Sequence, residues 1–183
     1  MIEIIWHARG GQGGFTASRL LGLAASVFSN YYSQAFSSFG PERRGAYVSS
    51  FTRINDKPIT DHSQVYECDY AIVFDSTLTR EIDVSKSLKK NGILLINSTL
   101  TKINSLSYNN KKIITFDATG LAIKESKTPI TNTIMLGVLA AISDIVSLEE
   151  LLKAIEVGMP LSLRAINKKL VETAYILQKE SYK

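Results

Sequence analysis

The fold is decided by the N-terminal stretch Ile2-Glu-Ile-Ile-Trp-His-Ala-Arg-Gly-Gly-Gln-Gly-Gly14, which runs from apolar residues into a cluster of glycines. Residues 2–6 are mostly β-branched or aromatic, which is typical of a buried strand. Residues 16–28 then carry apolar side chains at helical spacing. A strand, a glycine turn and a helix in this order predict a Rossmann-like opening of a parallel α/β sheet.

Further along the chain, the pattern alternates between strands and helices. Strands are predicted at 46–54, 70–74, 93–96 and 113–116. Helices are predicted at 78–90 with Asn91-Gly92 as the stop, at 134–145, from a Ser147-x-x-Glu150 capping box through 157, and at 162–178. We therefore predict a single α/β domain over residues 1–183, with three layers, a mostly parallel sheet and a helical C-terminal part.

Composition limits the chemistry of the 183 residues. Hydrophobic residues make up 45% and charged residues 21%, which is typical of a folded domain and not of a disordered chain. Cys68 is the only cysteine, so the chain has no internal disulfide and too few thiolates for a cysteine-ligated iron–sulfur cluster, which needs about four. Together with His7 and His62 it makes no spaced zinc signature.

Charge and hydropathy narrow the set of partners. The formal net charge is +4, but no basic run with interleaved aromatic residues accompanies it, so nucleic-acid binding is not expected. The apolar run 134–142 is shorter than the roughly 20 residues of a membrane span. The first residues lack the basic leader and apolar run of a signal peptide. We expect a cytoplasmic protein that binds no membrane.

The glycine turn predicts an anion site. Amides at a helix N-terminus lack partners and lie at the positive end of the helix dipole, and glycines let a ligand approach the backbone closely. Arg9 adds a positive charge and Thr16 adds a hydroxyl. Binding of a phosphate or carboxylate is one interpretation, and a tight turn in which side chains would clash is the other. The candidate residues are Arg9, Gly10, Gly11, Gln12, Gly13 and Thr16.

Two familiar nucleotide-binding motifs are incomplete here. Thr16 stands where the third glycine of a dinucleotide fingerprint belongs, and no acidic residue follows near Phe36 to bind a ribose. The Gly-Lys-Ser/Thr element of a Walker A loop is also missing. NAD binding is therefore disfavoured.

The stretch Phe39-Gly-Pro-Glu-Arg-Arg-Gly45 is a second candidate for anion binding. Arg43 and Arg44 stand between turn residues, and guanidinium groups suit phosphates and carboxylates. The alternatives are an ion pair with Glu42 in an exposed loop and a role in a protein interface.

Other polar residues are expected to serve the fold. We expect His7 to pack at a strand end and Cys68 to be buried. Asp75 and Asp117 each follow a strand and are expected to cap the next helix. The sequence contains no recognisable nucleophile–base pair, and we predict no catalytic residue on this chain.

Two motifs together carry a family resemblance. Trp6-His-Ala-Arg-Gly-Gly-Gln-Gly13 and Ser38-Phe-Gly-Pro-Glu-Arg-Arg-Gly-Ala46 resemble the gamma subunits of 2-oxoacid:ferredoxin oxidoreductases, most closely the pyruvate or 2-ketoisovalerate type. Further agreement lies at Ser50–Ile54, Asn97-Ser98 and Asn132–Gly137. The resemblance covers most of residues 1–140 in the same order.

The resemblance implies a non-catalytic subunit of a multisubunit enzyme. Such an enzyme decarboxylates a 2-oxoacid on thiamine diphosphate, passes electrons through iron–sulfur clusters to ferredoxin, and transfers the acyl group to coenzyme A. Partner chains of alpha, beta and delta type would hold the thiamine diphosphate and the clusters. The glycine turn, with Arg43 and Arg44, would contact coenzyme A or a subunit interface.

Other interpretations stay open from the sequence. The substrate is pyruvate in the first interpretation, and 2-ketoisovalerate, indolepyruvate or 2-oxoglutarate in the alternatives. The rivals outside this enzyme class are a stand-alone nucleotide-binding α/β module and an interface scaffold whose glycine loop binds no ligand.

Overall fold

The computed structural model describes residues 1–38, 45–100, 108 and 111–181. Its strands are β1 (Ile2–Arg9), β2 (Tyr32–Ser37), β3 (Tyr47–Asn55), β4 (Cys68–Val73), β5 (Leu88–Asn97) and β6 (Lys112–Phe116). Its α-helices are α1 (Gly14–Leu23), α2 (Ala118–Ser126), α3 (Asn132–Ile142), α4 (Leu148–Gly158) and α5 (Leu161–Ser181). A π-helical turn, η1 (Ala24–Phe28), extends α1, and a 3₁₀-helix, η2 (Ser76–Arg80), follows β4.

β1 lies inside the sheet, whose strand order is β2-β3-β1-β4-β5-β6. β1 pairs in parallel with β4, and parallel pairing continues to β5 and β6. β3 pairs antiparallel with both β1 and β2. The sheet is therefore mostly parallel, as predicted, and the carboxyl ends of β1, β4, β5 and β6 share one edge.

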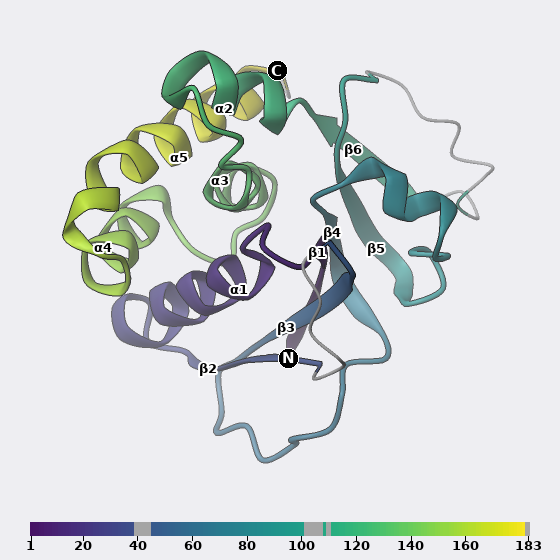
Figure 1. The fold of residues 1–183 in the computed structure, drawn as a ribbon. Coiled ribbons are helices and arrows are strands. Elements are labelled where there is room, and N and C mark those ends of the chain that lie inside the picture. The colour runs from purple at the N-terminus through teal and green to yellow at the C-terminus, as the bar shows by residue number, and fades with distance from the viewer. Residues whose placement is uncertain (39–44, 101–107, 109–110, 182–183) are drawn as a thin grey trace.

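The α-helices gather on one face of this sheet (Figure 1). Side chains alternate along β1, so Ile4, Trp6 and Ala8 pack against the helices while Ile5 packs on the opposite face. On that opposite face the cover comes from η2, through Leu78, and from the segments on either side of it. In the part of the chain that the structure describes, the third layer of the predicted architecture therefore contains no long helix.

The helix predicted at 78–90 is wrong. The chain forms only η2 in this region and then enters β5. Asp83 accepts hydrogen bonds from the Ser85 amide at 3.1 Å and from the Ser85 hydroxyl at 2.6 Å, and such local bonds compete with a helix. Leu88 then pairs with Cys68 of β4, so the predicted stop at Asn91-Gly92 lies inside a strand.

The C-terminal helices lie where the sequence predicts them, except that the helix predicted to reach residue 145 ends at Ile142, where Ser143 becomes extended. α3 is buried along nearly its whole length, and Ser147 with Glu150 forms the expected capping box at the start of α4. α5 packs so closely on α3 that a Cβ built on Gly137 would lie 2.6 Å from the Val171 carbonyl oxygen. Among the described residues, no helix has both the length and the apolar character needed to cross a bilayer.

Candidate functional site

The glycine turn lies at the carboxyl edge of the sheet, between β1 and α1. β1 continues into α1 on the helical face, whereas the neighbouring β4 continues into η2 on the opposite face. When connections leave adjacent parallel strands on opposite faces, a crevice opens at the carboxyl ends of those strands. The turn therefore occupies the position at which α/β sheets usually bind ligands.

Two glycines give the turn its shape. Gly11 and Gly13 have φ angles of 95° and 79°, in the left-handed region that side chains disfavour. The Gln12 amide donates to the Arg9 carbonyl at 3.0 Å, and the Gln12 side-chain oxygen accepts from the Arg9 amide at 2.7 Å. The side chain of Gln12 thus closes the turn.

The N-terminus of α1 presents amides without intrahelical partners. The first helical hydrogen bond joins the Ala17 amide to the Gly13 carbonyl at 3.0 Å. The amides of Gly14, Phe15 and Thr16 precede that bond. No described side chain caps them, and the first turn contains no acidic residue. The positive end of the helix dipole is therefore not neutralised within α1.

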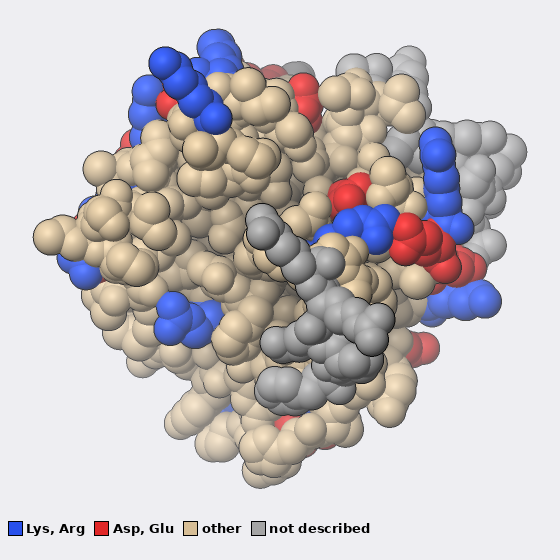
Figure 2. Space-filling view, viewed as in Figure 1, with Lys and Arg blue, Asp and Glu red and all other residues tan. Residues whose placement is uncertain are grey.

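A surface cleft of about 870 Å³ lies beside the glycine turn and the start of α1. α1 contributes Phe15 and Thr16 to it, and the strands contribute Phe36, Ser37 and Ser50. Figure 2 shows few charged side chains over α1 and α3 on the visible face, whereas acidic and basic side chains lie together on the side of β5. The cleft thus combines amide donors with largely uncharged walls.

The Arg9 guanidinium is already paired with acidic side chains of this chain. Its guanidinium donates to Asp75 at 2.9 Å and to Thr77 at 2.8 Å, and it also pairs with Glu81. The hydrogen bonds with Glu81 and Asp75 raise the pKa of Arg9. Partial burial would raise the pKa of Asp75, but the hydrogen bonds from Thr77 and Arg9 outweigh it and lower that pKa. Arg9 therefore links the end of β1 to the start of η2 through hydrogen bonds. The predicted contact of Arg9 with a bound anion stays a prediction.

Arg43 and Arg44 lie outside the described residues. Gly45, the residue after them, donates to the Gly10 carbonyl at 3.2 Å, and Gly10 donates to the Ala46 carbonyl at 2.8 Å. These bonds join the glycine turn to the chain just before β3.

Polar residues at the neighbouring strand ends have structural roles as helix caps. Asp75 and Asp117 accept hydrogen bonds from backbone amides at the starts of η2 and α2, so both predicted caps are confirmed. Asn97, at the end of β5, donates to the Phe74 carbonyl at 2.9 Å and accepts from the first amides of α2.

One residue beside the turn was not predicted as a site residue. Asn132, the first residue of α3, lies against Gly13, because a Cβ built on Gly13 would lie 2.5 Å from the Asn132 Nδ2 atom. The sequence identified Asn132 only as part of the family resemblance. No periodicity indicates that the start of α3 packs on the turn.

His7 is buried, as expected, on the face opposite the helices. Its Nδ1 lies 2.8 Å from the Tyr47 hydroxyl, and the two rings are stacked at 5.9 Å. Its Nε2 is inaccessible and has no hydrogen-bond partner among the residues that the structure describes. Burial lowers the pKa of His7 to about 4, so the ring is neutral at pH 7.

The pKa of His7 makes stability depend on pH. Protonation is favoured in the unfolded chain, so stability is lost as the pH falls from about 6.5 toward 4. Relative to His7→Gln, we expect the wild-type chain to lose roughly 2–3 kcal/mol more between pH 7 and pH 4.5, since each pKa unit is worth about 1.4 kcal/mol. Urea unfolding of both proteins at the two pH values measures this difference, and parallel losses would contradict it.

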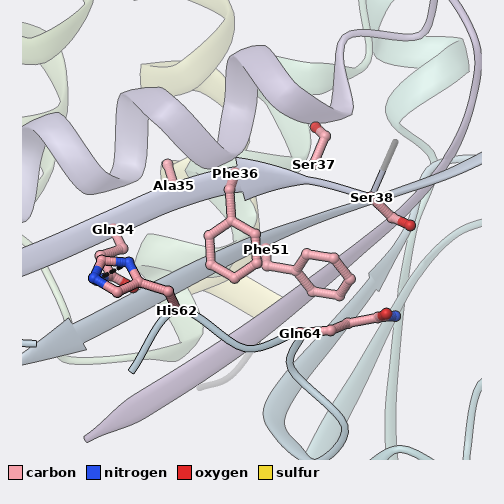
Figure 3. A pocket seen from close by; sticks show the side chains of 8 residues that line it. All are labelled: Gln34, Ala35, Phe36, Ser37, Ser38, Phe51, His62 and Gln64. Atoms are coloured by element: carbon pink, nitrogen blue, oxygen red, sulfur yellow. Dashed lines mark hydrogen bonds between the residues drawn. The ribbon is translucent and has the colours of Figure 1, made fainter. Parts of the chain in front are cut away.

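A second hollow, of about 520 Å³, lies along β2. Figure 3 shows Phe36 and Phe51 side by side in it, with Gln34 in contact with His62 at one end. The two phenylalanine rings are 5.2 Å apart. Sequence reasoning did not identify this hollow, because its wall comes from the pairing of β2 with β3.

Cys68 is a core residue. It is fully buried, and burial raises the pKa of its thiol to about 12. A cluster ligand has to be a thiolate, so this cysteine does not suit an iron–sulfur site.

The same strand–turn–helix arrangement occurs in known proteins. The family model for pyruvate ferredoxin/flavodoxin oxidoreductase matches residues 3–177. The chain belongs to this family. The family predicted from the motifs around Gly13 and Gly45 is therefore confirmed.

Two relatives in this family and one solved structure match over 95% or more of their length. The pyruvate synthase subunit PorC of Methanothermobacter marburgensis is 44% identical over 99% of both chains. The pyruvate/ketoisovalerate oxidoreductases common subunit gamma of Thermococcus kodakarensis is 42% identical over 96% of both chains. The crystal structure of the pyruvate oxidoreductase subunit PORC from Thermotoga maritima matches with a TM-score of 0.79 and 35% identity, over 96% of this chain and 95% of that one. The predicted α/β fold is confirmed by this likeness.

A more distant structure shares the fold alone. A 2-oxoglutarate:ferredoxin oxidoreductase from Magnetococcus marinus matches 98% of this chain with a TM-score of 0.77 and 15% identity. The match covers 31% of that longer chain. In that protein, the same fold forms one part of a larger polypeptide.

Proposed function

We propose that this family member is the gamma subunit of a pyruvate-type 2-oxoacid:ferredoxin oxidoreductase, which converts pyruvate to acetyl-coenzyme A and reduces ferredoxin. The observation that carries the proposal is the 44% identity to a pyruvate synthase subunit over 99% of both chains. 2-Ketoisovalerate is a second candidate substrate, because the Thermococcus relative is named as common to pyruvate and ketoisovalerate oxidoreductases.

In this proposal the redox chemistry belongs to alpha, beta and delta-type partner subunits in the cytoplasm. Thiamine diphosphate there supplies the electron sink for decarboxylation, and iron–sulfur clusters carry the electrons to ferredoxin. A single buried cysteine supports this division of labour, because it leaves the present chain without cluster ligands. The chain then contributes to assembly and to the coenzyme A side of the complex.

We further propose that the glycine turn binds phosphate groups of coenzyme A. The free amides of Gly14, Phe15 and Thr16 are suited to an anion, and the cleft volume of about 870 Å³ is large enough for part of a cofactor-sized ligand. Interface packing alone is the rival role for the turn.

Assembly is tested by purifying the chain under native conditions and identifying the chains that accompany it. We expect pyruvate-dependent reduction of ferredoxin by the complex, none by the isolated chain, and a loss of activity when the chain is left out of a reconstitution. Turnover by the isolated chain, or full activity without it, would contradict the proposed function.

The coenzyme A contact is tested with Thr16→Glu. Thr16 is the third residue of α1, where glutamate favours a helix, so we expect the fold to be retained. The new carboxylate would repel a phosphate, and we expect KM for coenzyme A to rise at least about tenfold while KM for pyruvate stays unchanged.

Ser162→Glu is the matched control. It places the same charge on an exposed residue in the first turn of α5, outside the cleft. We expect its KM for coenzyme A to be that of the wild type. An equal rise in both variants would indicate an effect of net charge and would contradict the assignment of the turn.

A further inference from the structure

The dipeptide Asn91-Gly92 lies in β5, in a stretch that takes no part in the sheet pairing. The short step from Cys68 to Tyr70 in β4 faces the longer step from Leu88 to Ile93 in β5. Residues 89–92 therefore bulge out of the ladder with β4, and the pairing with β6 begins only after them. The backbone of Asn91-Gly92 is thus not held by pairing with a neighbouring strand.

The start of this bulge is fixed, but the Asn91 side chain is not. Lys111 Nζ donates to the carbonyl oxygens of Leu88 and Lys89 at 3.0 and 2.8 Å. Lys89 Nζ in turn pairs with Asp69 at 2.8 Å. Asn91 is exposed, and no hydrogen bond joins its side chain to another residue that the structure describes. Its amide group is therefore not oriented by this part of the chain.

Gly92 places a backbone nitrogen next to Asn91 with no side chain beside it. Gly92 itself is buried, and a Cβ built on it would lie 2.9 Å from Leu88 Cδ2 and 3.1 Å from the carbonyl oxygens of Cys68 and Lys89. These atoms cover the side on which a side chain would stand, so the bulge requires glycine here. The Gly92 nitrogen is consequently not shielded from the Asn91 side chain by a Cβ atom.

We propose that Asn91 is a deamidation site, at which the chain forms isoaspartate without an enzyme. The Gly92 nitrogen attacks Cγ of Asn91, the bond from Cγ to Nδ2 breaks, and ammonia leaves with the proton of the Gly92 amide. Water then opens the resulting succinimide ring at either carbonyl, which gives aspartate or isoaspartate. Isoaspartate adds a methylene group to the backbone of the bulge and a carboxylate next to Lys90. This inference does not depend on the proposed function.

Asn97, at the end of the same strand, shows how the fold blocks this reaction elsewhere. Its Nδ2 donates to the Phe74 carbonyl at 2.9 Å, and its Oδ1 accepts from the Ala118 amide at 3.0 Å. The following amide, that of Ser98, donates to the Phe116 carbonyl at 3.0 Å. Both the amide group and the nitrogen that would attack it are thus held by hydrogen bonds. We expect Asn97 to stay intact in the folded chain.

The test is peptide mapping of the full chain after incubation in mildly alkaline buffer. No lysine or arginine separates Asn91 from Asn97, so every tryptic peptide that contains one also contains the other, and fragment ions compare the two directly. In the folded chain we expect the conversion of Asn91 to grow with time and with pH, with isoaspartate among the products and Asn97 unchanged. In urea, both residues should convert. An Asn91 that converts in urea but stays intact in the folded chain would overturn the inference.

Asn91→Gln is the matched control. It keeps an exposed side-chain amide, so we expect an unchanged melting temperature. Its attack by the Gly92 nitrogen would form a larger ring, which closes much more slowly. The variant should therefore show almost no gain of acid at position 91 over the same incubation. A gain equal to that of the wild type would mean that water removes the amide directly, and it would contradict attack by the Gly92 nitrogen.

Discussion

Replacing Arg53 by alanine is expected to lower the free energy of unfolding by about 3–5 kcal/mol, the usual range when one partner of a buried ion pair is removed. The Arg53 side chain is only 2% exposed, and its Nε donates to Glu3 at 3.1 Å. Its Nη1 donates to the carbonyl oxygens of Asp61 and Ser63 at 3.0 and 2.8 Å. The guanidinium also lies 5.5 Å from the centre of the Phe36 ring. The alanine variant would leave these acceptors without their donor.

Denaturant unfolding of the purified chain measures this loss. Arg53→Lys keeps the charge but cannot bond all of these groups at once, so its stability should fall between that of the wild type and that of the alanine variant. A loss below about 1 kcal/mol in Arg53→Ala, the range of an exposed ion pair, would contradict the structure around β3.

Replacing Gly137 by valine is expected to destabilise the chain by about 3 kcal/mol, at the upper end of the usual cost of overpacking. The Cβ atom would lie 2.6 Å from the Val171 carbonyl oxygen and 3.1 Å from its Cα, and backbone atoms of α5 cannot move aside as a side chain can. Gly137→Ala should also destabilise, although alanine in a helix is otherwise favoured by up to about 1 kcal/mol. A fall in the free energy of unfolding of Gly137→Ala would therefore show that the close packing of α3 on α5 outweighs the helix preference of alanine.

Gly22→Ala is the matched control for Gly137→Ala. Gly22 is a buried helical glycine as well, but its added Cβ would have side-chain atoms as its nearest neighbours, the Ser33 hydroxyl at 3.3 Å and the Ala35 Cβ at 3.6 Å. We expect its stability to be close to that of the wild type. Thermal unfolding compares the two alanine variants, and equal stability of both would contradict the close packing of α3 on α5.

The sequence predicted those elements whose pattern is local. The buried strand before the glycines, the capping box at Ser147 and the caps at Asp75 and Asp117 each depend on neighbours a few residues away. The helix at 78–90 failed because Asp83 and Ser85 bond to each other and because Leu88 pairs with β4. Parallel pairing joins segments far apart in the chain, so a local pattern does not indicate it.

The residues of the candidate site also differ in whether the sequence could predict their role. The glycines of the turn could be read from the sequence because their conformational role is local. The partners of Arg9 could not, since Asp75 and Glu81 reach it only after β4 has paired with β1. The position of Asn132 beside Gly13 likewise depends on how α3 packs at the carboxyl edge of the sheet.

The proposed binding of coenzyme A phosphates by the glycine turn is tested by measuring kcat/KM of the assembled oxidoreductase for two thiols. These are coenzyme A and pantetheine, which has the same thiol but no phosphate, each with the wild-type and the Thr16→Glu chains. We predict that Thr16→Glu lowers kcat/KM for coenzyme A at least about tenfold and leaves the value for pantetheine within about twofold. An equal loss for both thiols, or no loss for coenzyme A, would contradict phosphate binding at the glycine turn.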